Sequence, residues 1–223
     1  MKTPKILGIT PSTGCNLRCK FCYLKKGDLA DMSIVPFSVN RDKIISFLDR
    51  YEVRCISLYG GELLQADEEV MREYIMELYK LVVRYRVEEF IIFTNLTKIP
   101  VWVFSLPPNV RNSITISYSH YPYLKLSVSH ILRSLMKYQM YGFKVLVTTM
   151  FEYSDEIAQA FSRHNIQYEK YPDSAMFNSE NDLSDVVSTG ESCNHSETLF
   201  IFRDKAYDSL EDYFIEYGIS GGR

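Results

Sequence analysis

Short apolar runs alternate with longer amphipathic segments along most of this 223-residue chain. The apolar runs predict six strands, at residues 6–10, 53–59, 89–94, 113–119, 143–151 and 166–171. Amphipathic stretches with the 3.6-residue period predict helices at residues 40–51, 68–86, 124–141 and 155–164, the first capped by Asn40 and the last by Ser154. This alternation is typical of an α/β fold, in which parallel strands carry helices on their outer face.

The pattern changes after residue 171. Residues 172–202 contain no Lys or Arg but six acidic side chains, namely Asp173, Glu180, Asp182, Asp185, Glu191 and Glu197. We expect a loop up to residue 192, then a strand at 197–202 and a short helix at 209–217. The acidic loop is either a solvated surface or a cover over the end of the sheet, where it would disfavour an anionic substrate.

Composition excludes several classes of function. The formal net charge of -3 argues against a general polyanion-binding surface, so a nucleic-acid partner is not expected. No run of about 18 uncharged apolar residues occurs, and the N-terminus lacks the apolar core of a secretory signal. We therefore expect a cytoplasmic protein that does not enter a membrane.

Three of the five cysteines lie within eight positions, as Cys15, Cys19 and Cys22 in a C-x3-C-x2-C spacing. In a reducing compartment, clustered thiols indicate metal ligands before disulfides. Three thiolates can hold three irons of a [4Fe-4S] cubane and leave the fourth iron open, as a reactive centre requires. A structural zinc ion needs four protein ligands, and Cys55, Cys193 and the histidines are all distant in sequence. Zinc stays the alternative.

Two more motifs follow the next two predicted strands. Gly60-Gly61-Glu62 ends the second strand and Thr94-Asn95 ends the third, and catalytic groups of β/α barrels gather at these carboxyl ends. The cysteine segment resembles the signature of radical S-adenosylmethionine (radical SAM) enzymes. The second motif resembles the Gly-Gly-Glu motif of that family. The third is similar to its Thr-Asn-Gly turn, with Leu96 in place of the glycine.

The resemblance implies a partial (β/α)6 TIM-like barrel over residues 1–171, with residues 172–223 as a short extension that caps the same domain. It implies a [4Fe-4S] cluster on the three cysteines and reductive cleavage of S-adenosylmethionine. The resulting 5′-deoxyadenosyl radical would abstract hydrogen from an unidentified substrate. Flavodoxin or ferredoxin is the reductant that it suggests.

Within the family, the chain looks most similar to the peptide-modifying SPASM-type branch, so a peptide is one candidate substrate. However, Cys193 is the only cysteine after Cys55, so the auxiliary clusters of that branch cannot be ligated. Modification of a nucleoside or another small molecule is the alternative within enzymes. An iron–sulfur or zinc protein without turnover is the alternative outside them.

The resemblance also implies a set of cofactor-binding residues, namely Tyr23, Gly60, Gly61, Glu62, Thr94, Asn95, Ser117, Ser119 and Thr148. Glu62 is suited to accept hydrogen bonds from the ammonium group of the cofactor. Each position also has an ordinary interpretation, as a strand-terminating turn, a solvated hydroxyl or a packed aromatic ring. His120 is a candidate for the substrate cavity, and the alternative is a loop histidine with structural hydrogen bonds.

Overall fold

The computed structural model describes residues 5–19, 22–120, 126–149, 153–170, 176–178 and 197–221. Its main element is an eight-stranded sheet with the strand order β6-β5-β4-β3-β2-β1-β8-β9. The six predicted strands are confirmed as β1 (Lys5–Thr10), β2 (Val53–Leu58), β3 (Glu89–Thr94), β4 (Ile114–Ser119), β5 (Lys144–Thr149) and β6 (Gln167–Lys170). Each of them pairs in parallel with the next along the chain, which gives the partial barrel.

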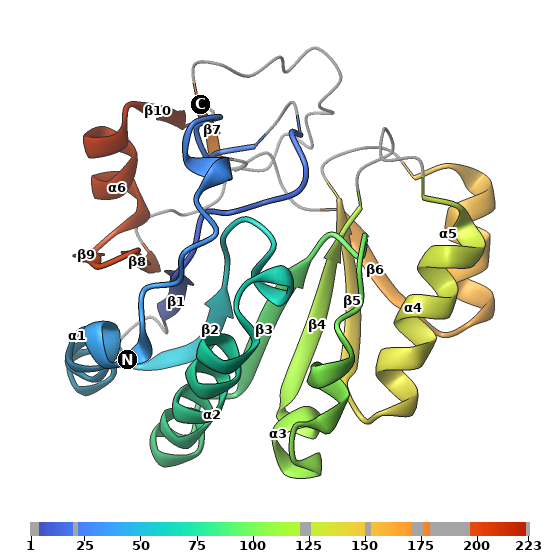
Figure 1. The fold of residues 1–223 in the computed structure, drawn as a ribbon, viewed down its shortest axis with the longest axis horizontal. Helices are drawn as coiled ribbons and strands as arrows, with labels where there is room; N and C mark the ends of the chain where they lie inside the picture. The colour runs from blue at the N-terminus through green and yellow to red at the C-terminus, as the bar shows by residue number, and fades with distance from the viewer. Residues whose placement is uncertain are drawn as a thin grey trace.

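Helices fill the connections between these strands, as Figure 1 shows. The predicted helices are present as α1 (Phe37–Arg50), α2 (Glu68–Tyr85), α4 (Val128–Met140) and α5 (Asp155–Arg163). The short helices η1 (Asp28–Ala30), η2 (Leu63–Gln65), η3 (Val101–Ser105) and α3 (Pro108–Ser113) complete the connections. None of the described helices is long and apolar enough to span a bilayer.

The ends of the helices show which capping predictions are right. Ser154 caps α5, because its hydroxyl accepts a hydrogen bond from the backbone of Ile157. The prediction that Asn40 caps α1 is wrong. The helix begins after Pro36, and Asn40 is buried inside it, where its amide donates to the carbonyl of Arg203 at 2.8 Å.

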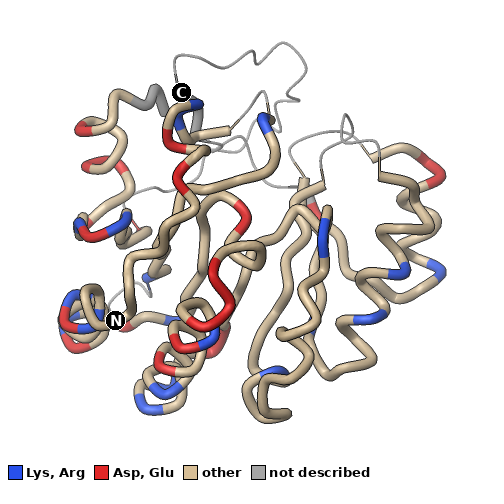
Figure 2. The backbone as a smooth tube through the Cα atoms, in the orientation of Figure 1, with Lys and Arg blue, Asp and Glu red and all other residues tan. Residues whose placement is uncertain are grey.

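Charges on α2 follow the helix dipole. Glu68 and Glu69 lie in its first turn and Arg84 in its last, and Figure 2 shows this change of sign along the helix. Acidic groups near the N-terminus and basic groups near the C-terminus both stabilise a helix. The Asp67 carboxylate adds an N-cap hydrogen bond to the backbone of Val70 at 3.0 Å. The terminal charges and the N-cap therefore favour the same helix that the amphipathic pattern of α2 predicts.

The tail of the chain extends the sheet beyond β1. Strand β8 (Thr198–Phe202) lies parallel to β1, and β9 (Lys205–Tyr207) returns antiparallel to β8. Helix α6 (Leu210–Tyr217) follows, and β7 (Met176–Asn178) pairs with β10 (Ile219–Gly221) in a separate two-stranded sheet. The predicted strand and helix of the tail are confirmed. The division at residue 171 stays a prediction, because Cys193 and most of the acidic loop lie outside the described residues.

Two apolar clusters hold these layers together. The larger cluster lies between the sheet and the helices, and it includes Leu7, Ile56 and Ile116, all fully buried. The smaller cluster joins the tail to the loop after β1. Its buried members are Leu24, Leu29, Phe200, Phe202, Tyr207, Leu210, Tyr213 and Phe214. The loop that carries the cysteines therefore packs against the last elements of the chain.

Candidate iron–sulfur site

The three cysteines lie on the loop between β1 and α1, and all are half-buried. Short backbone bonds shape this loop. Cys15 N–H donates to the carbonyl of Leu29 at 3.0 Å, and Cys22 N–H donates to that of Cys19 at 3.2 Å. The Sγ of Cys15 also accepts from the backbone N–H of Leu17 at 3.4 Å. In the described parts of the loop, these hydrogen bonds hold the backbone at Cys15 and Cys22, after the carboxyl end of β1.

Burial makes the free thiols weak acids. It raises the pKa of Cys19 to about 12 and that of Cys22 to about 11, and it raises the pKa of Cys15 as well. A neighbouring thiolate raises the pKa further for both Cys19 and Cys22. The metal-bound form of cysteine is the thiolate, so a cationic centre must displace these protons. A site with mutually repelling thiolates is stable only when positive charge is bound between them.

The donor set fits a cluster better than a single ion. In the part of the chain that the structure describes, no three His, Cys, Asp or Glu side chains are arranged to hold one metal ion. A zinc ion needs its ligands to converge on one point, whereas each thiolate of a cubane binds a different iron. Three cysteines on one loop are the donor set that the predicted [4Fe-4S] cluster with an open iron requires.

The Gly60-Gly61 turn packs directly on the backbone that precedes Cys15. Gly61 N–H donates to Ser12 O at 3.3 Å, and Glu62 N–H donates to Gly14 O at 2.8 Å. A Cβ atom on Gly61 would overlap Gly14 O, and Gly60 has a φ of +147°, which side chains rarely adopt. The close approach at these glycines is therefore made by the backbone of the cysteine loop.

Glu62 joins the ends of β2 and β3. Its carboxylate is fully buried and accepts from Thr94 Oγ1 at 2.9 Å and from Asn95 N–H at 2.6 Å. Three predicted cofactor-binding residues from two separate motifs therefore meet at one point. Burial raises the pKa of Glu62 to about 7, although these two hydrogen bonds act in the opposite direction. Glu62 is thus a buried acid that a nearby cation would ionise fully.

The raised pKa predicts how the stability of the cluster-free protein depends on pH. Between about pH 4.5 and about 7 the folded chain holds the Glu62 proton more tightly than the unfolded chain does. The free energy of unfolding should therefore fall as the pH rises through this window. Glu62→Gln stays neutral and should flatten this dependence in urea denaturation measured across the window. An unchanged slope in the variant would show that Glu62 titrates normally.

Leu96 keeps the turn of the third motif despite its side chain. Its φ is +56°, the left-handed conformation that glycine adopts without strain and that costs other residues about 1–2 kcal/mol. The side chain is fully buried, and the Leu96 carbonyl lies 3.0 Å from His130 Nε2 on α4. Leu96 therefore replaces the glycine of the family pattern, but the turn keeps the left-handed geometry.

The remaining predicted residues fall on two faces of the sheet. Strand register places Ser117 and Ser119 on the face opposite to Ile116 and Tyr118, with Thr148 beside Ser119. The hydroxyl of Ser117 is buried and has no hydrogen-bond partner among the described residues. Such a group normally has a partner, so this hydroxyl is available to a ligand.

His120 points away from that face. Its Nδ1 lies 3.2 Å from the Tyr118 hydroxyl, and its ring stacks on Tyr153 with centroids 5.7 Å apart. Burial lowers the pKa of His120, which favours the neutral imidazole. The structure thus gives His120 structural partners. Tyr23 is also placed by packing, since it lies against the smaller apolar cluster with its hydroxyl 3.3 Å from Thr10 Oγ1.

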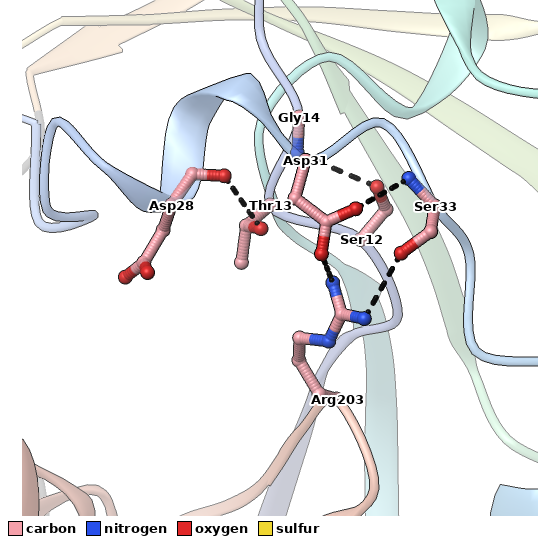
Figure 3. Close-up of polar contacts among 7 residues, drawn as sticks. All are labelled: Ser12, Thr13, Gly14, Asp28, Asp31, Ser33 and Arg203. Atoms are coloured by element: carbon pink, nitrogen blue, oxygen red, sulfur yellow. Dashed lines mark hydrogen bonds and ion pairs between the residues drawn. The ribbon is translucent and has the colours of Figure 1, made fainter.

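Sequence reasoning missed Arg203, which ties the tail to the cysteine loop. Figure 3 shows its guanidinium bonded to Asp31 Oδ2 at 2.9 Å and to Ser33 Oγ at 3.0 Å. Its backbone N–H also donates to Thr10 O, at the end of β1, at 2.8 Å. The one signal in the sequence is that Arg203 is the first basic residue after the long acidic segment. Its partners could not be inferred from that position.

We predict that Arg203→Ala loosens the loop without unfolding the protein. Hydrogen exchange of residues 28–33 should speed up, and iron uptake during reconstitution should slow, because the loop loses its outer anchor. Exposed ion pairs contribute little to global stability, so the unfolding midpoint should barely move. Lys205→Ala is the matched control, since Lys205 on the adjoining strand β9 forms an exposed ion pair with Glu216 on α6. Equal exchange in both variants would contradict the anchoring role.

Comparisons with known proteins show which family model and which solved structures this chain is similar to. Residues 10–98 match the family model of a 4Fe-4S single cluster domain. SuiB from Streptococcus suis, solved bound to precursor peptide SuiA, aligns with a TM-score of 0.58 and 15% identity over 99% of this chain and 48% of that one. The enzyme anSMEcpe with bound AdoMet aligns with a TM-score of 0.57 and 17% identity, over 75% of this chain and 51% of that one. Among curated proteins no sequence matches.

These alignments bear on the fold. The chain spans about half the length of the solved structures that it matches. At such low identity the similarity establishes a shared architecture, and this confirms the predicted partial barrel. The family model covers the three cysteines together with the Gly-Gly-Glu and Thr-Asn turns. The motifs that predicted the site thus all lie within the residues that match this one family model.

Proposed function

We propose that this chain is a radical SAM enzyme, because residues 10–98 match the family model of a 4Fe-4S single cluster domain and the chain shares the fold of SuiB and anSMEcpe. Cys15, Cys19 and Cys22 would hold the [4Fe-4S] cluster, and the Gly-Gly-Glu and Thr-Asn turns beside them would bind S-adenosylmethionine. When bound, the cluster and S-adenosylmethionine supply a one-electron cleavage that yields the 5′-deoxyadenosyl radical for hydrogen abstraction. One observation carries the proposal, namely three thiols on a loop against which the Gly-Gly-Glu turn packs directly.

Glu62 is suited to orient the cofactor. Its carboxylate accepts hydrogen bonds from Thr94 Oγ1 and from the backbone N–H groups of Asn95 and Leu64, and a lone pair remains for an ammonium group. A buried carboxylate with a raised pKa gains more from a cation than an exposed one does. We therefore assign Glu62 to the amino group of S-adenosylmethionine, with Thr94 and the Asn95 backbone as the groups that hold it in place.

The hydroxyl face of β4 and β5 is suited to the rest of the cofactor. Ser117 offers a buried hydroxyl without a partner among the described residues, and Ser119 and Thr148 lie side by side towards the strand ends. We assign these hydroxyls to the ribose or carboxylate groups. We also assign Tyr23, which directly follows Cys22, to the adenine of the cofactor, while its packing against the tail already explains its burial.

We propose a peptide as the substrate class. SuiB was solved with a precursor peptide, and the chain shares its architecture. The cysteine segment and the Gly-Gly-Glu turn also resemble the peptide-modifying branch in sequence. Electrons would come from a low-potential carrier such as flavodoxin or ferredoxin in the reducing cytoplasm, where exposed thiols persist. Modification of a small molecule is the second candidate.

Formation of 5′-deoxyadenosine tests the proposal. Protein reconstituted with iron and sulfide under anaerobic conditions should release 5′-deoxyadenosine from S-adenosylmethionine when dithionite is added. The Cys22→Ala variant, treated in the same way, should release none. A wild-type protein that carries its full cluster but forms no 5′-deoxyadenosine would support the non-enzymatic alternative. Addition of candidate peptides then tests the substrate class, since a substrate should convert cleavage into modified product.

A further inference from the structure

A closed ring of side-chain hydrogen bonds joins the third motif to the cysteine loop. Asn95 Nδ2 donates to Asn16 Oδ1 at 3.0 Å, Asn16 Nδ2 donates to Thr97 Oγ1 at 2.8 Å, and Thr97 Oγ1 donates to Asn95 Oδ1 at 2.6 Å. Asn16 directly follows Cys15, whereas Asn95 and Thr97 belong to the turn after β3. The ring therefore ties the first cluster ligand to a rigid strand end.

The orientation of the Asn95 amide is fixed by chemistry. The backbone N–H of Thr97 donates to Asn95 Oδ1 at 2.9 Å, and a backbone N–H can only donate. The atom that faces Thr97 must therefore be the oxygen, so the NH2 group faces the cysteine loop. One of its two hydrogens serves Asn16. The other is directed at Cys15 Sγ, which lies 3.9 Å from the nitrogen, within the range of a hydrogen bond to sulfur.

Neighbouring residues hold this amide still. Gln65 Nε2 donates to Thr97 Oγ1 at 2.9 Å, so that hydroxyl has its one donor and both acceptor sites occupied. The Asn95 backbone is fixed by the bond to Glu62, and the left-handed Leu96 sets the direction of the turn. A fully satisfied polar network is rigid, and any rotation of Asn95 would break several bonds together.

We infer that Asn95 is a positioning residue that tunes the cluster through an N–H···S hydrogen bond to Cys15. This inference rests on the proposed function, because it needs Cys15 to be a cluster ligand. Hydrogen bonds to the sulfurs are one of the factors that set the potential of an iron–sulfur cluster. The N–H dipole stabilises the reduced cluster, which carries one more negative charge, so it raises the reduction potential. The side-chain amide of Asn95 thereby donates to a cluster ligand, while the backbone N–H of the same residue donates to Glu62.

The test is the midpoint potential of the reconstituted cluster, measured by EPR-monitored redox titration without S-adenosylmethionine. Asn95→Ser cannot reach the sulfur and should shift the potential to a more negative value. Asn95→Asp keeps the shape but places a carboxylate oxygen against the thiolate, so the shift should be larger. Asn109→Asp is the matched control. The exposed side-chain amide of Asn109 binds only the Tyr79 hydroxyl among the described residues. Both residues are distant in sequence from the cysteine loop, so the cluster of this variant should keep the wild-type potential.

The outcomes separate this inference from the proposed function. A wild-type protein that takes up no cluster contradicts the function itself. Full iron content with an unchanged potential in both Asn95→Ser and Asn95→Asp contradicts the inference and leaves the function intact. Reduced iron content in variants that keep their circular dichroism spectrum supports it, since Asn95 is not a ligand. Loss of the fold in both variants would overturn it, because Asn95 would then be a structural residue.

Discussion

Replacement of Cys15, Cys19 or Cys22 by alanine, one at a time, will abolish the iron–sulfur cluster. With two thiolates left, the loop cannot hold three irons, and burial already keeps the remaining thiols protonated in the absence of metal. Iron and sulfide analysis with visible absorption spectra of reconstituted protein will show this as near-complete loss. The fold should survive, because the loop thiols lie outside the larger apolar cluster.

Two other cysteines serve as controls for this experiment. Cys55 is buried on β2, where its Sγ lies 3.4 Å from Ser57 Oγ, and Cys55→Ala should keep the full iron content. Cys193→Ala should keep it as well. If all three loop variants retained the iron of the wild type, the ligands would have to be other residues, and the proposed function would fail with them.

Gly61→Ala will disrupt the site through the turn after β2 that packs on the cysteine loop. The added methyl group would overlap the Gly14 carbonyl and would lie 2.5 Å from that of Thr13, and backbone atoms cannot move aside as a flexible side chain does. Overpacking typically lowers the free energy of unfolding by about 1–3 kcal/mol. The overlap here involves backbone atoms of both segments, so we expect a loss at the upper end of this range or above it. We expect a lower urea midpoint for the cluster-free protein and little cluster after reconstitution.

Gly27→Ala is the matched control, on the cysteine loop against which Gly61 packs. A Cβ atom on Gly27 meets nothing within 4 Å, and its φ of -63° suits alanine. This change should be neutral or stabilising by about 0.4–1 kcal/mol, because it restricts the unfolded chain. A Gly61→Ala protein as stable as Gly27→Ala, with a full cluster, would mean that the two loops do not pack as described.

The strands could be predicted, and the cysteine loop could be proposed as a site, because their signals are local. A strand buried in a parallel sheet is an apolar run, and a ligand loop has its spacing written in a few consecutive residues. The N-cap of α1 was predicted wrongly for a related reason. Asn40 is a frequent capping residue, but here its amide serves the carbonyl of Arg203, which is distant in sequence. Its local preference was overridden by a tertiary contact.

Other features depended on contacts that no short pattern contains. The partner of Gly61 is the backbone of residues 12–14, and glycine alone does not say whether a ligand or another chain segment comes close. The face of the sheet on which His120 lies follows from the register of the strands. That register cannot be inferred from the identity of a residue at the end of a strand. The strand at 197–202 was expected, but its place beside β1 depends on pairing across most of the chain.

The pairing of β8 with β1 has a consequence for biosynthesis. The cysteine loop emerges from the ribosome early, but its anchor Arg203 follows Cys22 by 181 residues. At about 5–20 residues per second, roughly 10–40 s pass before β8 can dock and fix the loop. During that interval the cysteine loop lacks the contacts that β8 and Arg203 make in the folded chain. Assembly factors that deliver iron and sulfide would therefore meet a competent site only after synthesis of this part of the chain is complete.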